Sequence, residues 1–134
     1  MEPANDIEPV LIVFYEIISG QKTESRNWDK LRSLFHPGAC LFPNSVTVNP
    51  VNSCGIDIDT YIQNLDRFLG QNDFFEQGSI TQVVIQENIA SLIGTYEARH
   101  TKSDQEPFIH GVNFVHLIHT GSEWKITSMI WRNL

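Results

Sequence analysis

The second half of the chain alternates between apolar and polar residues with a period of two. The pattern recurs in four segments, separated by short polar or glycine-containing breaks, at positions 78–86, 89–100, 108–120 and 123–131. A period of two places successive side chains on opposite faces of a strand. We therefore predict four strands that pair antiparallel, the last two through a turn near Thr120 and Gly121.

The first half of the chain has the spacing of helices instead. Residues 6–19 begin with Asp6 as a candidate cap, carry Pro9 in the expected first turn and stop at Gly20. Their apolar side chains run nearly all the way round the helix, which indicates burial on most faces. We predict that this segment is the central helix of the domain.

Two further helices are predicted before the long strands begin. Residues 28–35 carry an apolar stripe behind a cap at Asn27, and the sequence His-Pro-Gly that follows is typical of a helix end. Residues 56–70 repeat apolar side chains at helical spacing, and Gly70 fits a left-handed terminator. Between these helices lie two short strand candidates, at 39–43 and 45–49.

Length and charge limit the classes of function. The 134 residues fit a single domain spanning 1–134, and helices followed by antiparallel strands define an α+β fold with helices on one sheet face. The 16 acidic and 9 basic residues give a net charge of −7, and the basic residues are scattered singly. We therefore expect neither a nucleic acid nor a membrane surface as partner, because both require clustered positive charge.

The chain carries no pattern for export or metal binding. Its first residues are acidic where a signal peptide would be basic, and no apolar run approaches the roughly 20 residues that span a bilayer, so we expect a cytoplasmic protein. Cys40 and Cys54 match no metal spacing, and we expect them to be reduced, small core residues.

Several short motifs resemble those of one superfamily. The order of elements, together with WDKLRSLFHPGACLFP, FFE, GTYEAR, HGVNFVHL and WKITSMIW, is similar to the nuclear transport factor 2-like superfamily over roughly residues 6–132. Its members include ketosteroid isomerase, scytalone dehydratase, limonene epoxide hydrolase and the polyketide cyclases. More narrowly, the chain looks like an uncharacterised bacterial group with a ketosteroid isomerase-like or SnoaL-like fold.

The resemblance implies a cystatin-like α+β fold, in which a cone-shaped, curved antiparallel sheet wraps around three N-terminal helices. We expect six strands in that sheet. The resemblance also implies a homodimer formed through the outer sheet face, and a pocket between the first helix, the third helix and the inner sheet face. Because this fold serves many unrelated activities, the reaction has to be argued from the residues themselves.

The catalytic residues of ketosteroid isomerases are only partly matched. The resemblance places Tyr15 where those enzymes have an aromatic hydroxyl in an oxyanion hole. The position of their general base falls near Pro43, which cannot accept a proton, and the position of their carboxylic acid falls near Asn113 or Val115. Two of three roles are missing, so steroid isomerisation is not expected. The Asp, Arg, Asp array of the epoxide hydrolases does not appear on the matching strands either.

Alternation along 109–118 separates two faces. Asn113 shares one face with aliphatic residues, whereas His110 and His116 lie on the other. If the first face lines the hollow, Asn113 either positions a ligand or is satisfied by a neighbouring group. We expect the histidines on the outer face, against solvent or a dimer partner. His116 and His119 point to opposite faces, so we predict no metal site, and no motif indicates a cofactor.

Two carboxylates stand within apolar sequence, Glu76 and Glu97, and Arg32 and Arg99 are their candidate ion-pair partners. An unpartnered buried carboxylate would favour its acid form and could serve as a general acid or base, whereas a paired one would tie helix to sheet. The side chains expected to contact a ligand are Tyr15, Phe42, Phe74, Glu97, Asn113 and Trp131. Tyr15, Glu97 and Asn113 are also weak candidates for catalysis.

Three functions remain open from the sequence. The first is binding of a small hydrophobic molecule in the cone, which aromatic walls with few polar groups favour. The second is a cofactor-independent lyase or isomerase acting on a cyclic or polyketide-like substrate, with Glu97 or a histidine as base and Tyr15 as hydroxyl donor. The third is a protein-protein interaction domain that uses the outer sheet face.

Overall fold

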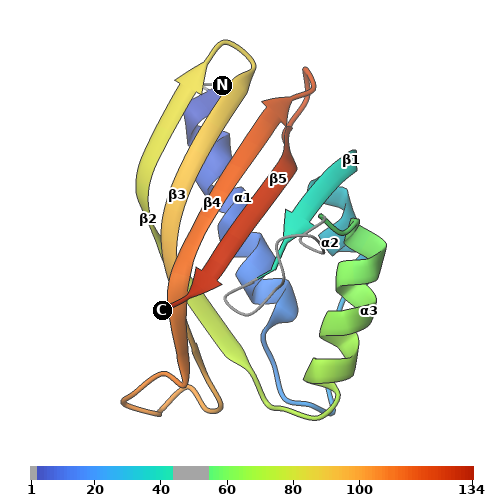
Figure 1. Ribbon diagram of the computed structural model, residues 1–134, viewed down its shortest axis with the longest axis vertical. Coiled ribbons are helices and arrows are strands. Elements are labelled where there is room, and N and C mark those ends of the chain that lie inside the picture. Colours follow the sequence, from blue (N-terminus) through green and yellow to red (C-terminus); the bar gives the residue numbers. More distant parts are fainter. Residues whose placement is uncertain (1–2, 44–54) are drawn as a thin grey trace.

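A computed structural model of the chain describes residues 3–43 and 55–134 (Figure 1). The strand candidate at 45–49 and Cys54 lie outside these residues. The elements follow in the order α1 (Pro3–Ile18), α2 (Trp28–Ser33), β1 (Phe35–Phe42), α3 (Ile58–Leu69), β2 (Phe75–Gln86), β3 (Ile89–Arg99), β4 (Ile109–His119) and β5 (Trp124–Asn133). Among the described helices, none combines the length and the apolar content needed to cross a bilayer.

The strands form one curved, unclosed sheet in the order β1-β5-β4-β3-β2 (Figure 1). The four late strands pair antiparallel, as predicted, and the β4–β5 turn closes with a 3.0 Å hydrogen bond from the Thr120 N–H to the Glu123 carbonyl. Gly121 in that turn has φ +101°, which suits glycine. β1 joins β5 in parallel, so the described residues hold five strands rather than six.

The predicted α+β class is confirmed, with α1 lying across one face of the sheet (Figure 1). α1 buries Ile7, Leu11, Phe14 and Ile18, whose spacing of three and four residues gives one continuous apolar stripe. The prediction that α1 is buried on most faces was wrong in one respect, because Ile12 on the opposite stripe is 52% exposed. That stripe borders the site described below.

Several predicted helix ends were wrong. α1 begins at Pro3 rather than Asp6, so Pro9 lies inside the helix instead of in its first turn. α2 ends at Ser33, because the chain turns directly into β1 at Phe35. Gly70 ends α3 with φ −70°, a right-handed conformation that needs no glycine.

The His-Pro-Gly sequence forms part of β1 rather than a terminator. β1 is at the edge of the sheet and its register with β5 shifts between Phe35 and Cys40, and an edge strand with such a shift tolerates proline. Cys40 is exposed on this strand and forms no disulfide, so it is not the core residue that the sequence predicted.

Candidate functional site

Strand register decides which side chains lie on the concave face beneath α1. In β3 the residues at even positions from Ala90 to Ala98 are buried, and Tyr96 among them is only 4% exposed. Tyr96 pairs with Gly78 on one side and with Gly111 on the other, while Glu76 pairs with Ala98. Because paired residues share a face, Glu76 and Tyr96 both point toward the helices.

Five polar side chains gather on this concave face, and we call them the inner polar cluster. They come from five elements, and they include all three tyrosines of the chain: Tyr15, Tyr61, Glu76, Tyr96 and Asn113. Burial raises the pKa of each tyrosine, and the negative charge of Glu76 raises all three further. The carboxyl group of Glu76 is therefore close enough to act on every hydroxyl of the cluster.

Glu76 supplies the carboxyl group of the cluster. Burial raises the pKa of its carboxyl group to about 8, because lost hydration disfavours the ionised form. Among the described residues, no side chain or backbone group forms a hydrogen bond or ion pair with this carboxyl group. At neutral pH it is therefore mostly a neutral acid that can donate one hydrogen bond.

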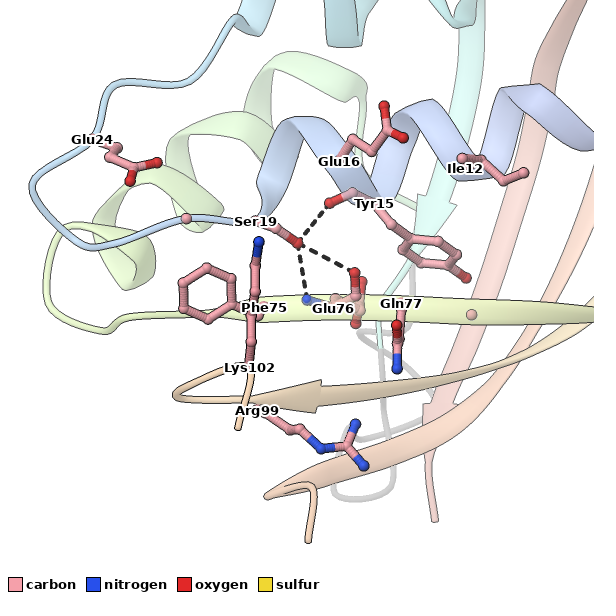
Figure 2. Close-up of a pocket in the computed structure, with 12 residues that line it drawn as sticks. Ile12, Tyr15, Glu16, Ser19, Glu24, Phe75, Glu76, Gln77, Arg99 and Lys102 are labelled. Carbon is pink, nitrogen blue, oxygen red and sulfur yellow. Dashed lines mark hydrogen bonds between the residues drawn. The ribbon is translucent and has the colours of Figure 1, made fainter. Parts of the chain in front are cut away.

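The backbone of Glu76 is held in place by α1. The Ser19 hydroxyl accepts from the Glu76 N–H at 2.9 Å and lies 3.2 Å from the Glu76 carbonyl oxygen, to which it can donate. Figure 2 shows these contacts, with Glu76 on the side of β2 that faces α1 and Gln77 on the opposite side. The carboxyl group is thus fixed at the helix–strand junction.

Tyr15 and Asn113 form a buried pair. The Asn113 Nδ2 donates to the Tyr15 hydroxyl at 2.6 Å, and the two residues are 4% and 6% exposed respectively. Burial raises the pKa of Tyr15, the Glu76 charge adds to this, and the bond from Asn113 opposes it. Since the Tyr15 oxygen accepts from Asn113, its own proton is available for another acceptor.

A cleft of about 630 Å³ opens between α1 and β2 beside this pair (Figure 2). Its walls combine one exposed apolar side chain, the Tyr15 ring and charged groups of both signs. The lining residues are Ile12, Tyr15, Glu16, Ser19, Gly20, Glu24, Phe75, Glu76, Gln77, Gly78, Arg99 and Lys102. This cleft lies on the β2 side of α1, whereas the resemblance had implied a pocket between the first and third helices.

The structure brings only some of the predicted ligand contacts together. Tyr15 lines the cleft, and Asn113 lies behind it as its hydrogen-bond donor. Glu97 is on the outer face of β3, where its Oε2 pairs with Arg99 at 3.1 Å and its side chain is 49% exposed. It therefore does not reach the inner face, and the carboxyl group found there belongs to Glu76.

The predicted aromatic walls are dispersed over three places. Trp131 packs edge-on against Tyr61 of α3, with ring centroids 5.4 Å apart. Phe74 is buried between Phe68 and Phe108, at centroid distances of 5.7 and 6.1 Å. Phe42 is half-buried near Gly55, at the end of β1, which is the opposite edge of the sheet from β2.

The remaining candidates lie on the outside. His110 and His116 are exposed on the outer face of β4. Arg32 pairs with Asp29 at 2.9 Å and Asp59 at 2.6 Å, so it ties α2 to α3 rather than helix to sheet. Within the described parts of the chain, no group of three or more His, Cys, Asp or Glu side chains is placed to hold a metal ion.

Tyr96 and Tyr61 are the two cluster members that were not among the predicted site residues, and of these only Tyr61 lies on a helix. It stands in the apolar stripe of α3, where an aromatic ring is expected in a core, and its burial agrees with that reading. Only its hydroxyl distinguishes it from phenylalanine. A tyrosine at a core-facing helical position was therefore the available indication of a polar interior.

Comparisons with other proteins identify the fold. No family model and no curated protein sequence matches the chain. A nuclear transport factor 2-like protein of unknown function from Silicibacter pomeroyi superposes with a TM-score of 0.68 at 13% identity, covering 98% of this chain and 95% of that one. A Nostoc punctiforme protein of unknown function with a cystatin-like fold has a TM-score of 0.70 at 9% identity, covering 98% and 90%.

A third solved structure carries the provisional name of an enzyme. This protein from Novosphingobium aromaticivorans, provisionally assigned as a scytalone dehydratase, has a TM-score of 0.71 at 16% identity and covers 98% of this chain and 83% of that one. Similarity at this level of identity concerns the backbone and not the chemistry. Element order, sheet topology and these superpositions together show that the chain has the nuclear transport factor 2-like fold.

Proposed function

We propose that the protein binds a small molecule with an apolar body and one acceptor oxygen, such as a cyclic ketone or alcohol, in the cleft between α1 and β2. The observation that carries this proposal is the Glu76 carboxyl group, which points to the concave face and has no partner among the described residues. Glu76 is partly buried, and a partly buried polar group without a protein partner destabilises the fold, so a ligand that binds it adds stability.

The polarity of the ligand follows from the two groups that would contact it. A neutral Glu76 donates a hydrogen bond, and Tyr15 has its proton available because Asn113 occupies its oxygen. Two donors match one oxygen with two lone pairs. Ile12, which is 52% exposed, and the Tyr15 ring supply apolar surface for the body of the molecule.

The test is binding of a matched set of cyclic ketones and hydrocarbons, measured by ligand-observed NMR. We expect ketones to bind better than hydrocarbons of equal size, and Tyr15→Phe to weaken ketone binding roughly fivefold, the value of one neutral hydrogen bond. Ketone affinity should fall as the pH passes 8, because the ionised carboxylate no longer donates. In Glu76→Gln, which donates at every pH, affinity should stay constant.

Glu97→Gln is the matched control, since it removes an equal carboxylate from the outer face. We expect it to bind ketones as the unmodified protein does. Equal binding of ketones and hydrocarbons, with no effect of Tyr15→Phe, would contradict the proposal.

A second candidate function is proton transfer at a carbon next to a carbonyl group. It is favoured by the pKa of about 8 at Glu76, because a general acid or base works best when its pKa is near the ambient pH. The Glu76 carboxylate would take the proton while Tyr15 donates to the carbonyl oxygen. Exchange of that hydrogen for deuterium in D₂O, followed by NMR and lost in Glu76→Gln, would support it. Exchange at the uncatalysed rate would reject it.

We also propose self-association through the outer sheet face. Ile93, Phe114 and Ile130 form a row across β3, β4 and β5 by their register, and Phe114 and Ile130 are 52% and 50% exposed. Ile93 is half-buried, and a row of apolar side chains with two exposed members is typical of a surface that another protein covers. A second copy of the chain is the partner proposed.

Phe114→Lys is expected to weaken this dimer at least about tenfold, because it places a charge at the centre of the apolar row. Sedimentation velocity over a range of concentrations measures the change. Ile12→Lys is the control, since Ile12 is equally exposed at 52% but lies on α1. A protein that stays monomeric without any substitution would refute the dimer.

A further inference from the structure

β2 ends the sheet, so one side of it pairs with β3 and the other is a free edge. The residues that follow α1 pair with the first part of this edge. Gly20 forms two backbone hydrogen bonds with Phe74, at 2.7 and 3.0 Å, and the Ser19 hydroxyl accepts a hydrogen bond from the Glu76 N–H at 2.9 Å. The residues after α1 thus act as a short extra strand beside the start of β2.

After Glu76 the backbone groups on this edge of β2 have no such partners among the described residues. Successive residues of a strand direct their N–H and C=O to opposite sides, so Phe74 and Glu76 face the free edge and Gly78 is the next to do so. Gly78 is exposed, and its backbone has no hydrogen-bond partner on this side among the described residues. Ile80 follows in the same phase, before the register with β3 shifts.

There is space beside these groups. A hollow of about 150 Å³ is bounded by α1 on one side and the edge of β2 on the other, and it shares Ile12, Tyr15 and Gly78 with the larger cleft. The two spaces are therefore adjacent along the helix and the strand, and we refer to them together as the groove. Its residues beyond the larger cleft are Glu8, Leu11, Ser79 and Ile80.

The charge of the groove determines which kind of partner it attracts. Glu8 and Glu16 on α1 and Glu24 in the loop after it are exposed along the groove, and they outnumber the basic residues Arg99 and Lys102 that also line the larger cleft. The whole chain has a net charge of −7. A second copy docked edge to edge would bring two such acidic walls together. An extended segment with basic side chains is attracted instead.

We propose that the free edge of β2 at Gly78 and Ile80 binds an extended basic peptide, which adds to the sheet as a further strand in the groove beside α1. The peptide backbone exchanges hydrogen bonds with Gly78, continuing the pairing that Gly20 and Ser19 begin. Its basic side chains lie near Glu8 and Glu16. The peptide would occupy part of the cleft proposed for the small molecule, so the two would compete at Tyr15 and Gly78, whereas the outer sheet face is not involved.

Selective N-methylation of a probe peptide tests the strand pairing. The probe is a capped peptide of three Lys-Val repeats, and two further versions carry methyl groups on all valine amides or on all lysine amides. These two sets of amides point to opposite edges of an extended peptide, so only one set can face β2. We expect one methylated version to bind at least tenfold more weakly than the other, and the Gly78 amide to become protected from hydrogen exchange when the parent peptide binds.

The charge contribution is tested with Glu8→Gln and Glu16→Gln together. We expect binding of the parent peptide to weaken roughly three- to tenfold, the range for two exposed ion pairs. Glu87→Gln, which removes one negative charge in the turn directly after β2, should bind as the unmodified protein does. Equal binding of the two methylated peptides, or protection of the Gly78 amide by protein concentration alone, would overturn the proposal, the latter by showing a second copy at the edge.

Discussion

The protein is expected to lose stability as the pH rises from 5 to 9, and Glu76→Gln is expected to remove most of that loss. The folded protein holds the Glu76 proton up to a pKa of about 8, whereas the unfolded chain releases it near the ordinary value of 4.5. Between these values the folded state binds more protons, so the free energy of unfolding falls as pH rises. Below 4.5 the penalty is absent, and above 8 it is complete.

The size of the loss follows from the pKa difference. Each pKa unit corresponds to about 1.4 kcal/mol, and we expect ~3 kcal/mol in total, since water reaches the partly buried side chain and reduces the full amount. Asp57 and Asp104 have pKa values lowered by hydrogen bonds to Thr60 and Thr101, so their contributions change only below the ordinary value of 3.8. Neither aspartate therefore contributes to the change in stability that is expected from Glu76 between pH 5 and 9.

Urea unfolding at pH 5, 7 and 9 measures this effect. Glu76→Gln should be more stable than the unmodified protein at pH 9 and similar to it at pH 5. Glu97→Gln, which alters an exposed carboxylate on the opposite face, should keep the full decline. A decline that persists unchanged in Glu76→Gln would show that its carboxyl group ionises in the folded state as easily as in water, and the proposed ligand contact would lose its basis.

Much of the fold could be predicted because the strands follow simple alternation. The face of β4 that carries Asn113 turned inward because its neighbours Gly111, Val115 and Leu117 are small or apolar, while His110 and His116 are exposed. The pairing of β1 could not be predicted in this way. β1 lies parallel to β5, and a parallel pair joins segments far apart in sequence without a local turn to indicate it.

The candidate site was harder to predict, because it depends on which side of each strand faces α1. Glu76 and Glu97 have similar apolar neighbours in the sequence, yet they lie on opposite faces of adjacent strands, since Glu97 pairs with Gln77 rather than with Glu76. A shift of one residue in that register would have exchanged their roles. The sequence around the aromatic residues does not indicate which face of the sheet they occupy. Before the register was known, it therefore could not be predicted that Tyr15 lines the cleft and that Phe42 and Phe74 do not.

Gly111→Ala is expected to destabilise the protein by about 3 kcal/mol or more. A β carbon at this position would collide with the backbone carbonyl of Arg132 in β5 and with the hydroxyl of Tyr96. The carbonyl cannot move without opening the β4–β5 pairing, and Tyr96 is held by a 2.7 Å hydrogen bond to the Asn133 Oδ1. The added β carbon would be overpacked against backbone on one side and against a hydrogen-bonded ring on the other. Neither can move away without losing hydrogen bonds, so the substitution is destabilising.

Gly38→Ala supplies the matched control for this substitution. The β carbon that it adds would meet nothing closer than the His36 ring at 3.5 Å, an ordinary contact, and Gly38 is exposed on β1. Its effect on urea unfolding should stay within about 0.5 kcal/mol. Similar stabilities for the two variants would mean that Tyr96 does not lie over Gly111, and the inner polar cluster would then lose one of its three hydroxyl groups. A large loss in Gly111→Ala alone supports the close packing of the Tyr96 ring on the Gly111 backbone.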